Sequence, residues 1–196
     1  MPVNRSIPDV AQKRKDWNGL ISGFKASDLV FLDESGCNTD MTRRYAYSLG
    51  GSRAVDSAPL SKPKNTTILS SIQLDGTLRY TTFSGGTTVE RFKRYLETDL
   101  LPHLNGNSVL IMDDMKSHHA KAVRNLLDSS GVRYIYLPPY SPDLNPIEKL
   151  WSKVKAFLRK FKARTLDALP NAIQNAFHSV TISDCSGWFR FCGYAL

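Results

Sequence analysis

Apolar and polar residues alternate along the chain in two kinds of pattern, short apolar runs and longer stretches of helical periodicity. The short runs at 28–34, 108–114 and 132–138 predict three buried strands. Residues 66–74 and 77–83 are rich in β-branched side chains and flank an Asp-Gly pair, which predicts an antiparallel hairpin. The chain is therefore expected to build a sheet from both buried strands and a hairpin.

Helices are predicted where apolar residues recur with a period near 3.6. The pattern places them at about 88–101, 121–131, 147–161 and 166–177. Because strands and helices follow one another along the chain, the expected fold class is α/β, a mixed sheet flanked by helices. A length of 196 residues is sufficient for one such domain.

The two ends of the chain are expected to lie outside the central sheet. Residues 1–27 form a basic lead-in segment that holds a short amphipathic pattern, and residues 28–196 form the domain itself. The C-terminal tail, with Trp188, Phe189 and Phe191, is expected to pack back on the domain.

The composition favours a polyanionic partner. Lys and Arg number 26 against 18 Asp and Glu, so the formal charge is +8 and nucleic acid is the leading candidate partner. The three cysteines cannot all pair and no CxxC occurs, which indicates a reducing compartment in which they are core residues. No apolar stretch approaches a membrane span and no secretory signal is present, so no membrane partner is expected.

Acidic residues follow two of the predicted buried strands. They are Asp33 with Glu34, and Asp113 with Asp114, while Glu148 enters from the helix that follows the proline-rich segment PPYSPDLNP. Ligands of open α/β sheets usually bind at strand ends. Clustered carboxylates are hard oxygen ligands that suit Mg²⁺ or Mn²⁺, and three of them can hold two ions for attack on a phosphodiester.

Each acid also has a purely structural explanation. Asn145, Pro146 and Glu148 fit the N-cap, N1 and N3 positions of a helix, so Glu148 can simply close a capping box. The two roles are compatible, because a helix N-terminus favours an ionised carboxylate. Asp33 and Asp113, taken singly, can be ordinary strand-end residues.

Three segments together resemble a known family. FLDESGCNTDMTRRY, LIMDDMKSHHA and LPPYSPDLNPIEKLW are similar to the three catalytic blocks of bacterial insertion-sequence transposases of the mariner superfamily. The 34 residues between Asp113 and Glu148 match the spacing of that superfamily. The resemblance, which runs from about residue 28 to the end, implies an RNase H-like fold, a DDE triad of Asp33, Asp113 and Glu148, and two Mg²⁺ or Mn²⁺ ions held by these acids. No small-molecule cofactor is implied.

Neighbours of the triad are expected to support it without binding metal. Glu34 matches the family pattern, and Asp113 takes the catalytic role because the family block reads Asp-Asn-x-x-x-His. Asp114 departs from that pattern and adds a negative charge where asparagine is usual. His118 can position water, contact a phosphate or serve as a structural histidine at a helix start.

The resemblance implies cleavage of transposon ends and transfer of the freed 3′ hydroxyl strand to target DNA. Such enzymes usually act as homodimers, and the expected location is a bacterial cytoplasm, in association with the nucleoid. Residues 1–27 are too few for the helix-turn-helix domain of full-length relatives, so the chain is expected to be a catalytic domain alone, as a frameshift half, a truncated remnant or an isolated fragment. The alternative is an inactive or regulatory DNA-binding derivative, and a less specific nuclease is a smaller alternative.

Basic residues supply candidate DNA contacts independently of the resemblance. The candidates are Arg43, Arg44, Arg53, Lys149, Lys153 and Lys160. Further basic residues, among them Lys155 and Arg159, crowd the helix that starts near residue 147. A solvated helix face is the alternative explanation of that crowding.

Overall fold

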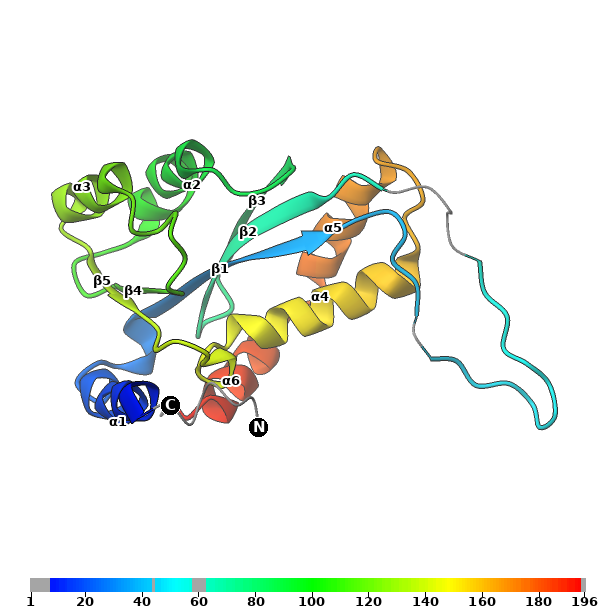
Figure 1. The fold of residues 1–196 in the computed structure, drawn as a ribbon, viewed down its shortest axis with the longest axis horizontal. Helices are drawn as coiled ribbons and strands as arrows, with labels where there is room; N and C mark the ends of the chain where they lie inside the picture. Colours follow the sequence, from blue (N-terminus) through cyan, green and yellow to red (C-terminus); the bar gives the residue numbers. More distant parts are fainter. Residues whose placement is uncertain (1–7, 44, 58–62, 195–196) are drawn as a thin grey trace.

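A five-stranded sheet with helices on both faces organises residues 8–43, 45–57 and 63–194, which are the residues that the computed structural model describes (Figure 1). The strands are β1 Leu29–Cys37, β2 Thr66–Gln73, β3 Leu78–Ser84, β4 Val109–Met112 and β5 Arg133–Tyr136. Their order is β3-β2-β1-β4-β5, with antiparallel pairing among β1, β2 and β3 and parallel pairing among β1, β4 and β5. The predicted mixed sheet and hairpin are confirmed.

The helices are distributed over the two faces of this sheet. They are α1 Pro8–Ile21, α2 Val89–Tyr95, α3 Lys121–Ser130, α4 Ile147–Phe161, α5 Ala168–His178 and α6 Ile182–Phe191. In Figure 1, α2 and α3 lie on one side of the sheet and α4, α5 and α6 on the other. The helix predicted at 88–101 ends its α-helical part at Tyr95 and continues as a π-helical turn over Leu96–Leu100.

Each face of the sheet has its own hydrophobic core, because successive side chains of a strand point to opposite faces. Phe31 and Ile111 belong to the core beneath α4, α5 and α6. Leu32 and Met112, one residue further along each strand, belong to the core beneath α2 and α3. All four side chains are fully buried, so the register of β1 against β4 is fixed from both faces.

The parallel pairing of β1 with β4 determines where two of the acids emerge. Leu32 pairs with Met112, and the β1–β4 pairing ends at this level. Asp33 and Asp113 come next on the two strands. They therefore leave neighbouring strands at the same level, side by side at the edge of the β1–β4 pairing.

Strand β1 is longer than the prediction of 28–34. It continues to Cys37 because its antiparallel hydrogen bonds with β2 persist after its pairing with β4 has ended. Asp33 and Glu34 thus lie inside a strand rather than at its end. The apolar run at 28–34 indicates how far β1 lies in the hydrophobic core, but it does not indicate how far β1 pairs with β2.

The C-terminal residues form a helix where a tail was predicted. Helix α6 begins at a capping box made by Thr181 and Asp184. Phe189 is fully buried and Trp188 is partly buried against the core, as predicted. Phe191 is 65% exposed, and its ring packs back on the Lys149 ammonium of α4 and not on the hydrophobic core.

Helix α1 lies within the predicted lead-in segment and is attached to the domain. Its Val10 and Trp17 side chains are buried. Arg14 forms a two-pronged ion pair with Asp143, with Nη–Oδ distances of 2.7 and 3.2 Å, and also donates to the Ser141 hydroxyl. These contacts hold α1 against the loop that leads into α4.

Two further expectations concern surface and interior. No helix among the described residues is long and apolar enough to cross a membrane. Cys37, Cys185 and Cys192 are all buried and unpaired, which confirms their prediction as core residues.

Candidate active site

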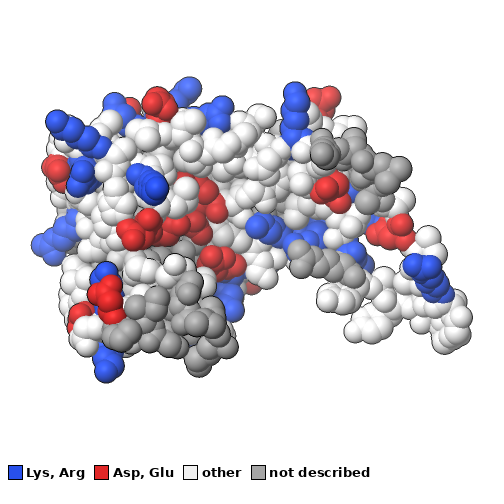
Figure 2. All heavy atoms as spheres, viewed as in Figure 1, with Lys and Arg blue, Asp and Glu red and all other residues white. Residues whose placement is uncertain are grey.

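One pocket brings together acids from three distant segments of the chain. Asp33 of β1, Asp113 after β4 and Glu148 in the first turn of α4 all line a pocket of about 410 Å³. The proline-rich loop at 137–142 forms another part of its wall. Among the described residues that line the pocket there is no Lys or Arg. Figure 2 shows Asp and Glu side chains gathered near the middle of this face.

Asp33 is the most buried of the three acids. Its Oδ2 accepts a hydrogen bond from the indole N–H of Trp151 at 3.1 Å, and its Oδ1 accepts from the backbone N–H of Glu34 at 2.7 Å. Burial raises the pKa of Asp33 to about 7, and the negative charges of Asp113, Glu34 and Glu148 add to the increase while the backbone hydrogen bond opposes it. The pocket therefore gathers carboxylates whose mutual repulsion is not relieved by any Lys or Arg among its described lining residues.

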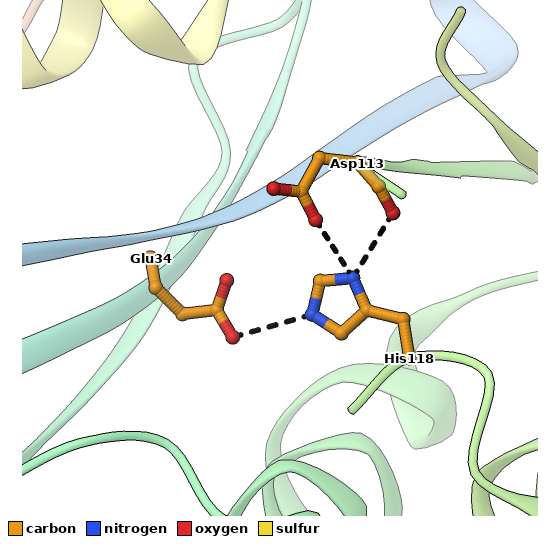
Figure 3. Close-up of side chains that lie close together, drawn as sticks. All are labelled: Glu34, Asp113 and His118. Atoms are coloured by element: carbon orange, nitrogen blue, oxygen red, sulfur yellow. Dashed lines mark hydrogen bonds and ion pairs between the residues drawn. The ribbon is translucent and has the colours of Figure 1, made fainter. Parts of the chain in front are cut away.

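His118 lies between Asp113 and Glu34 and links the two side chains (Figure 3). Its Nδ1 lies 2.9 Å from Asp113 Oδ1 and 3.1 Å from the Asp113 carbonyl oxygen, and its Nε2 lies 3.2 Å from Glu34 Oε1. The ring is fully buried and stacks on Phe92 with the ring centroids 4.2 Å apart. Because a carbonyl oxygen can only accept, Nδ1 carries a hydrogen.

The protonation of His118 decides what the three linked residues can do. Burial alone lowers the pKa of His118, but the hydrogen bonds to Asp113 and Glu34 outweigh burial and raise the pKa to about 10. The imidazolium then donates from both nitrogens. Glu34, Asp113 and His118 are close enough to hold an ion, but both ring nitrogens already face oxygen partners, an arrangement that favours His118 as a support for Asp113.

Glu148 lies at the open rim of the pocket. Partial burial of its carboxyl raises the pKa of Glu148, with Lys155 opposing the shift and Asp113 adding to it. The capping-box alternative is not what the structure shows. The Glu148 backbone N–H donates to the Asn145 carbonyl oxygen, and within the described part of the chain the Asn145 Oδ1 has no hydrogen-bond partner. Pro146 takes helical dihedral angles and Asn145 takes extended ones, as the N1 and N-cap positions require, so the backbone matches the predicted helix start and only the side-chain hydrogen bonds of a capping box are missing.

Asp114 also lines the pocket, but its carboxylate has another partner. Asp114 Oδ1 is hydrogen-bonded to His119 Nε2, and both side chains are substantially exposed. The His119 ring packs at a tilt against Tyr136, with centroids 4.2 Å apart. The Asp114 carboxylate, which stands where the family pattern has asparagine, therefore points toward a surface histidine.

The predicted arginine contacts lie on the segment after β1. Arg43 and Arg53 are exposed, and residues 45–57 extend away from the sheet in Figure 1. Arg44 lies outside the described residues. Arg164 fixes the start of this segment, since it donates to the carbonyl oxygens of Thr39 and Met41.

The predicted lysine contacts on α4 have unequal surroundings. The Lys149 ammonium lies 3.7 Å from the centroid of the Phe191 ring, and Lys153 forms an ion pair with Asp184. Both contacts join α4 to α6. Lys160 is exposed beside a groove that Arg43 also lines.

Three residues with evident roles at the site were not identified from the sequence. Trp151 has core periodicity, and its core assignment is correct, but its indole N–H also holds Asp33. Its position three residues after Glu148 was the available signal. Phe92, which supports the His118 ring, and Arg14, which holds the loop before α4, carry no local signal because their partners are distant in sequence.

Comparison with known proteins identifies the family. The model of the DDE superfamily endonuclease family matches residues 28–170. The chain belongs to this family. The Tc1 transposable-element transposase of Caenorhabditis elegans is 29% identical over 97 residues, which cover 47% of this chain and 36% of the relative. The predicted family is confirmed at the level of DDE endonucleases with Tc1/mariner-type relatives.

Solved structures confirm the fold. The catalytic domain of Mos1 mariner transposase superposes with a TM-score of 0.71 at 16% identity, over 92% of this chain and 86% of that one. A pre-cleavage Mos1 transpososome gives a TM-score of 0.79 at 19% identity, over 93% and 59%. The fold is the predicted RNase H-like one. The chain spans about three fifths of the Mos1 chain in that complex and just over a third of the Tc1 transposase.

The His118 link predicts a large difference between two adjacent histidines. His118→Ala should lower the free energy of unfolding at pH 7 by about 3 kcal/mol, because it leaves two carboxylates at the site without their shared partner. His119→Ala should cost less than about 1 kcal/mol, because its hydrogen bond to Asp114 is exposed. Urea denaturation of both variants measures the difference, and equal losses would contradict the role given to His118.

The same link predicts how stability depends on pH. Since the folded-state pKa of His118 is raised from 6.5 to about 10, its contribution is complete below about pH 6.5 and is lost as the pH rises through about 10. Urea denaturation between pH 6 and 10 should show this decline in the wild type and not in His118→Ala. A wild-type imidazole that titrates near pH 6.5 by NMR would refute it.

Proposed function

We propose that this chain is the catalytic domain of a DNA transposase whose Asp33, Asp113 and Glu148 hold divalent metal ions. The observation that carries the proposal is the convergence of these acids in one pocket lined by no described cation. Three carboxylates that converge on one pocket are a good fit to hard cations such as Mg²⁺ or Mn²⁺. Mos1 mariner complexes have been crystallised with each of these metals.

Two bound metal ions would activate the attacking water or 3′ hydroxyl and stabilise the leaving oxygen of the phosphodiester. The protein's own residues keep the carboxylates in place. Trp151 and the Glu34 backbone orient Asp33. Asp113 Oδ1 accepts hydrogen bonds from His118 and from the backbone N–H of Met115. These two bonds leave Oδ2 available to a metal ion in the pocket.

DNA is the proposed substrate. The formal charge of +8 favours it, and the relatives include a Mos1 paired-end complex with a transposon end and a strand transfer complex. The proposal extends to cleavage of transposon ends, joining to a target, homodimer formation and an origin in a bacterial insertion sequence, with action at the nucleoid. In this proposal, residues 28–196 form the catalytic domain, and Glu34, Asp114 and His118 surround the triad. The DNA contacts of Arg43, Arg44, Arg53, Lys149, Lys153 and Lys160 stay predictions.

Substitution of the triad tests the activity. Asp33→Ala, Asp113→Ala and Glu148→Ala should each reduce Mn²⁺-dependent nicking of a supercoiled plasmid by about a thousand-fold or more, because each removes a carboxylate that stabilises developing charge. Asp114→Ala is the matched control and should stay within about tenfold of wild type, since His119 already occupies that carboxylate.

The outcome also separates the alternatives. Joining of an oligonucleotide 3′ end to plasmid distinguishes a transposase from a nuclease that only hydrolyses. A wild-type chain that binds DNA but neither nicks nor joins it would overturn the proposal in favour of an inactive or regulatory derivative.

Metal binding predicts a gain in stability that does not depend on DNA. At about one hundred times its Kd, Mn²⁺ should raise the free energy of unfolding by about 2.7 kcal/mol. Asp113→Asn should lose this gain, because the neutral amide is a poorer ligand, while Asp128→Asn, on the distant helix α3, should keep it. Thermal denaturation with and without Mn²⁺ measures both. A gain that survives in Asp113→Asn would place the ion elsewhere.

A further inference from the structure

A groove lies between the end of β1 and helix α4, beside the acidic pocket. Residues 36–38 and 40–42 form one wall, and Lys155 and Arg159 form the other. Figure 2 shows Lys and Arg side chains gathered next to the central acidic group. The groove lining thus holds two cations and one carboxylate, that of Asp40, and it carries a net positive charge next to the acidic pocket.

Both walls of the groove begin at the candidate active site. Along β1, Asp33 and Cys37 are four residues apart and so share a face of the strand. Along α4, Lys155 and Arg159 follow Glu148 by seven and eleven residues, close to two and three helical turns, so the three share one face. The wall formed by residues 39–41 is fixed by Arg164.

The other lysines of α4 lie on a different face. Lys149, Lys153 and Lys160 are roughly 120° around the helix from Glu148. Lys149 and Lys153 are engaged with α6, through Phe191 and Asp184. By contrast, Lys155 and Arg159 make no ion pair or hydrogen bond with any residue that the structure describes.

The spacing of these cations suits a nucleic-acid strand. At 1.5 Å per residue, Lys155 and Arg159 lie about 10 and 16 Å from Glu148 along the helix axis. A DNA strand advances about 3.4 Å per nucleotide, so the two cations are placed roughly three and five nucleotides from the acids. Arginine in addition matches phosphate with two parallel hydrogen bonds.

We propose that the DNA strand entering the acidic centre runs along this groove, with its phosphates bound by Lys155 and Arg159. This inference rests on the proposed function, because it takes DNA as the substrate. It selects two of the many basic residues of α4 and assigns Lys153 and Lys160 a smaller share of binding.

Two double variants that each remove two positive charges provide the test. Binding of a fluorescent 30-bp duplex is measured by anisotropy without divalent metal, over a series of salt concentrations. K155A/R159A should weaken binding at least tenfold and reduce the salt slope by about 2, as expected for the loss of two phosphate contacts. K153A/K160A should weaken binding by a smaller factor than K155A/R159A, and K155R/R159K should keep near-wild-type binding.

The results distinguish this inference from the proposed function. Equal losses of affinity in the two double variants, or a larger loss in K153A/K160A, would overturn the proposal that this groove binds DNA. A wild-type chain that does not bind the duplex would overturn it as well. If K155A/R159A does not fold, the single variants Lys155→Gln and Arg159→Gln replace it. Wild-type plasmid nicking with Mn²⁺ is scored separately, so its absence would overturn the proposed function without altering the anisotropy comparison.

Discussion

The site depends on the register between two parallel strands. Leu32 pairs with Met112, each locked in a buried core, and the next residue on each strand is an aspartate. A shift of one residue would send Asp33 into the core under α2 and α3 and destroy the pairing of the acids. Alternation along β1 then separates the roles of neighbours, since Asp33 meets Trp151 of α4 and Glu34 meets His118 on the other face.

Each acid is held by a different part of the fold. Asp113 depends on the buried His118 ring, which Phe92 of α2 supports. Glu148 depends on the loop before α4, and that loop is held from outside by Arg14 of α1 and by the Tyr194 hydroxyl, which donates to the Leu144 carbonyl oxygen. The first and last described segments therefore help to position the acid on α4, although neither contributes to the pocket's acids.

Much of this arrangement was predictable, and the failures have physical causes. Buried strands and amphipathic helices follow from periodicity, and the three acids were selected because each lies in a recognisable sequence block. The length of β1 could not be predicted from the apolar run, because backbone pairing with β2 continues through the polar residues from Asp33 to Cys37. Contacts such as Arg14 with Asp143 join residues 129 positions apart, and local patterns carry no trace of them. The sequence shows how many lysines α4 carries, but it does not show which of them are engaged with α6, because those partners are brought close only by the tertiary fold.

The central claim is that Asp33, Asp113 and Glu148 bind the metal while His118 only supports Asp113. The most direct measurement is an anomalous-diffraction map of crystals of the chain soaked in Mn²⁺. The account predicts anomalous peaks in the pocket within bonding distance of the carboxylates of all three acids. A peak between Glu34, Asp113 and His118, with the imidazole nitrogen as a ligand, would contradict it.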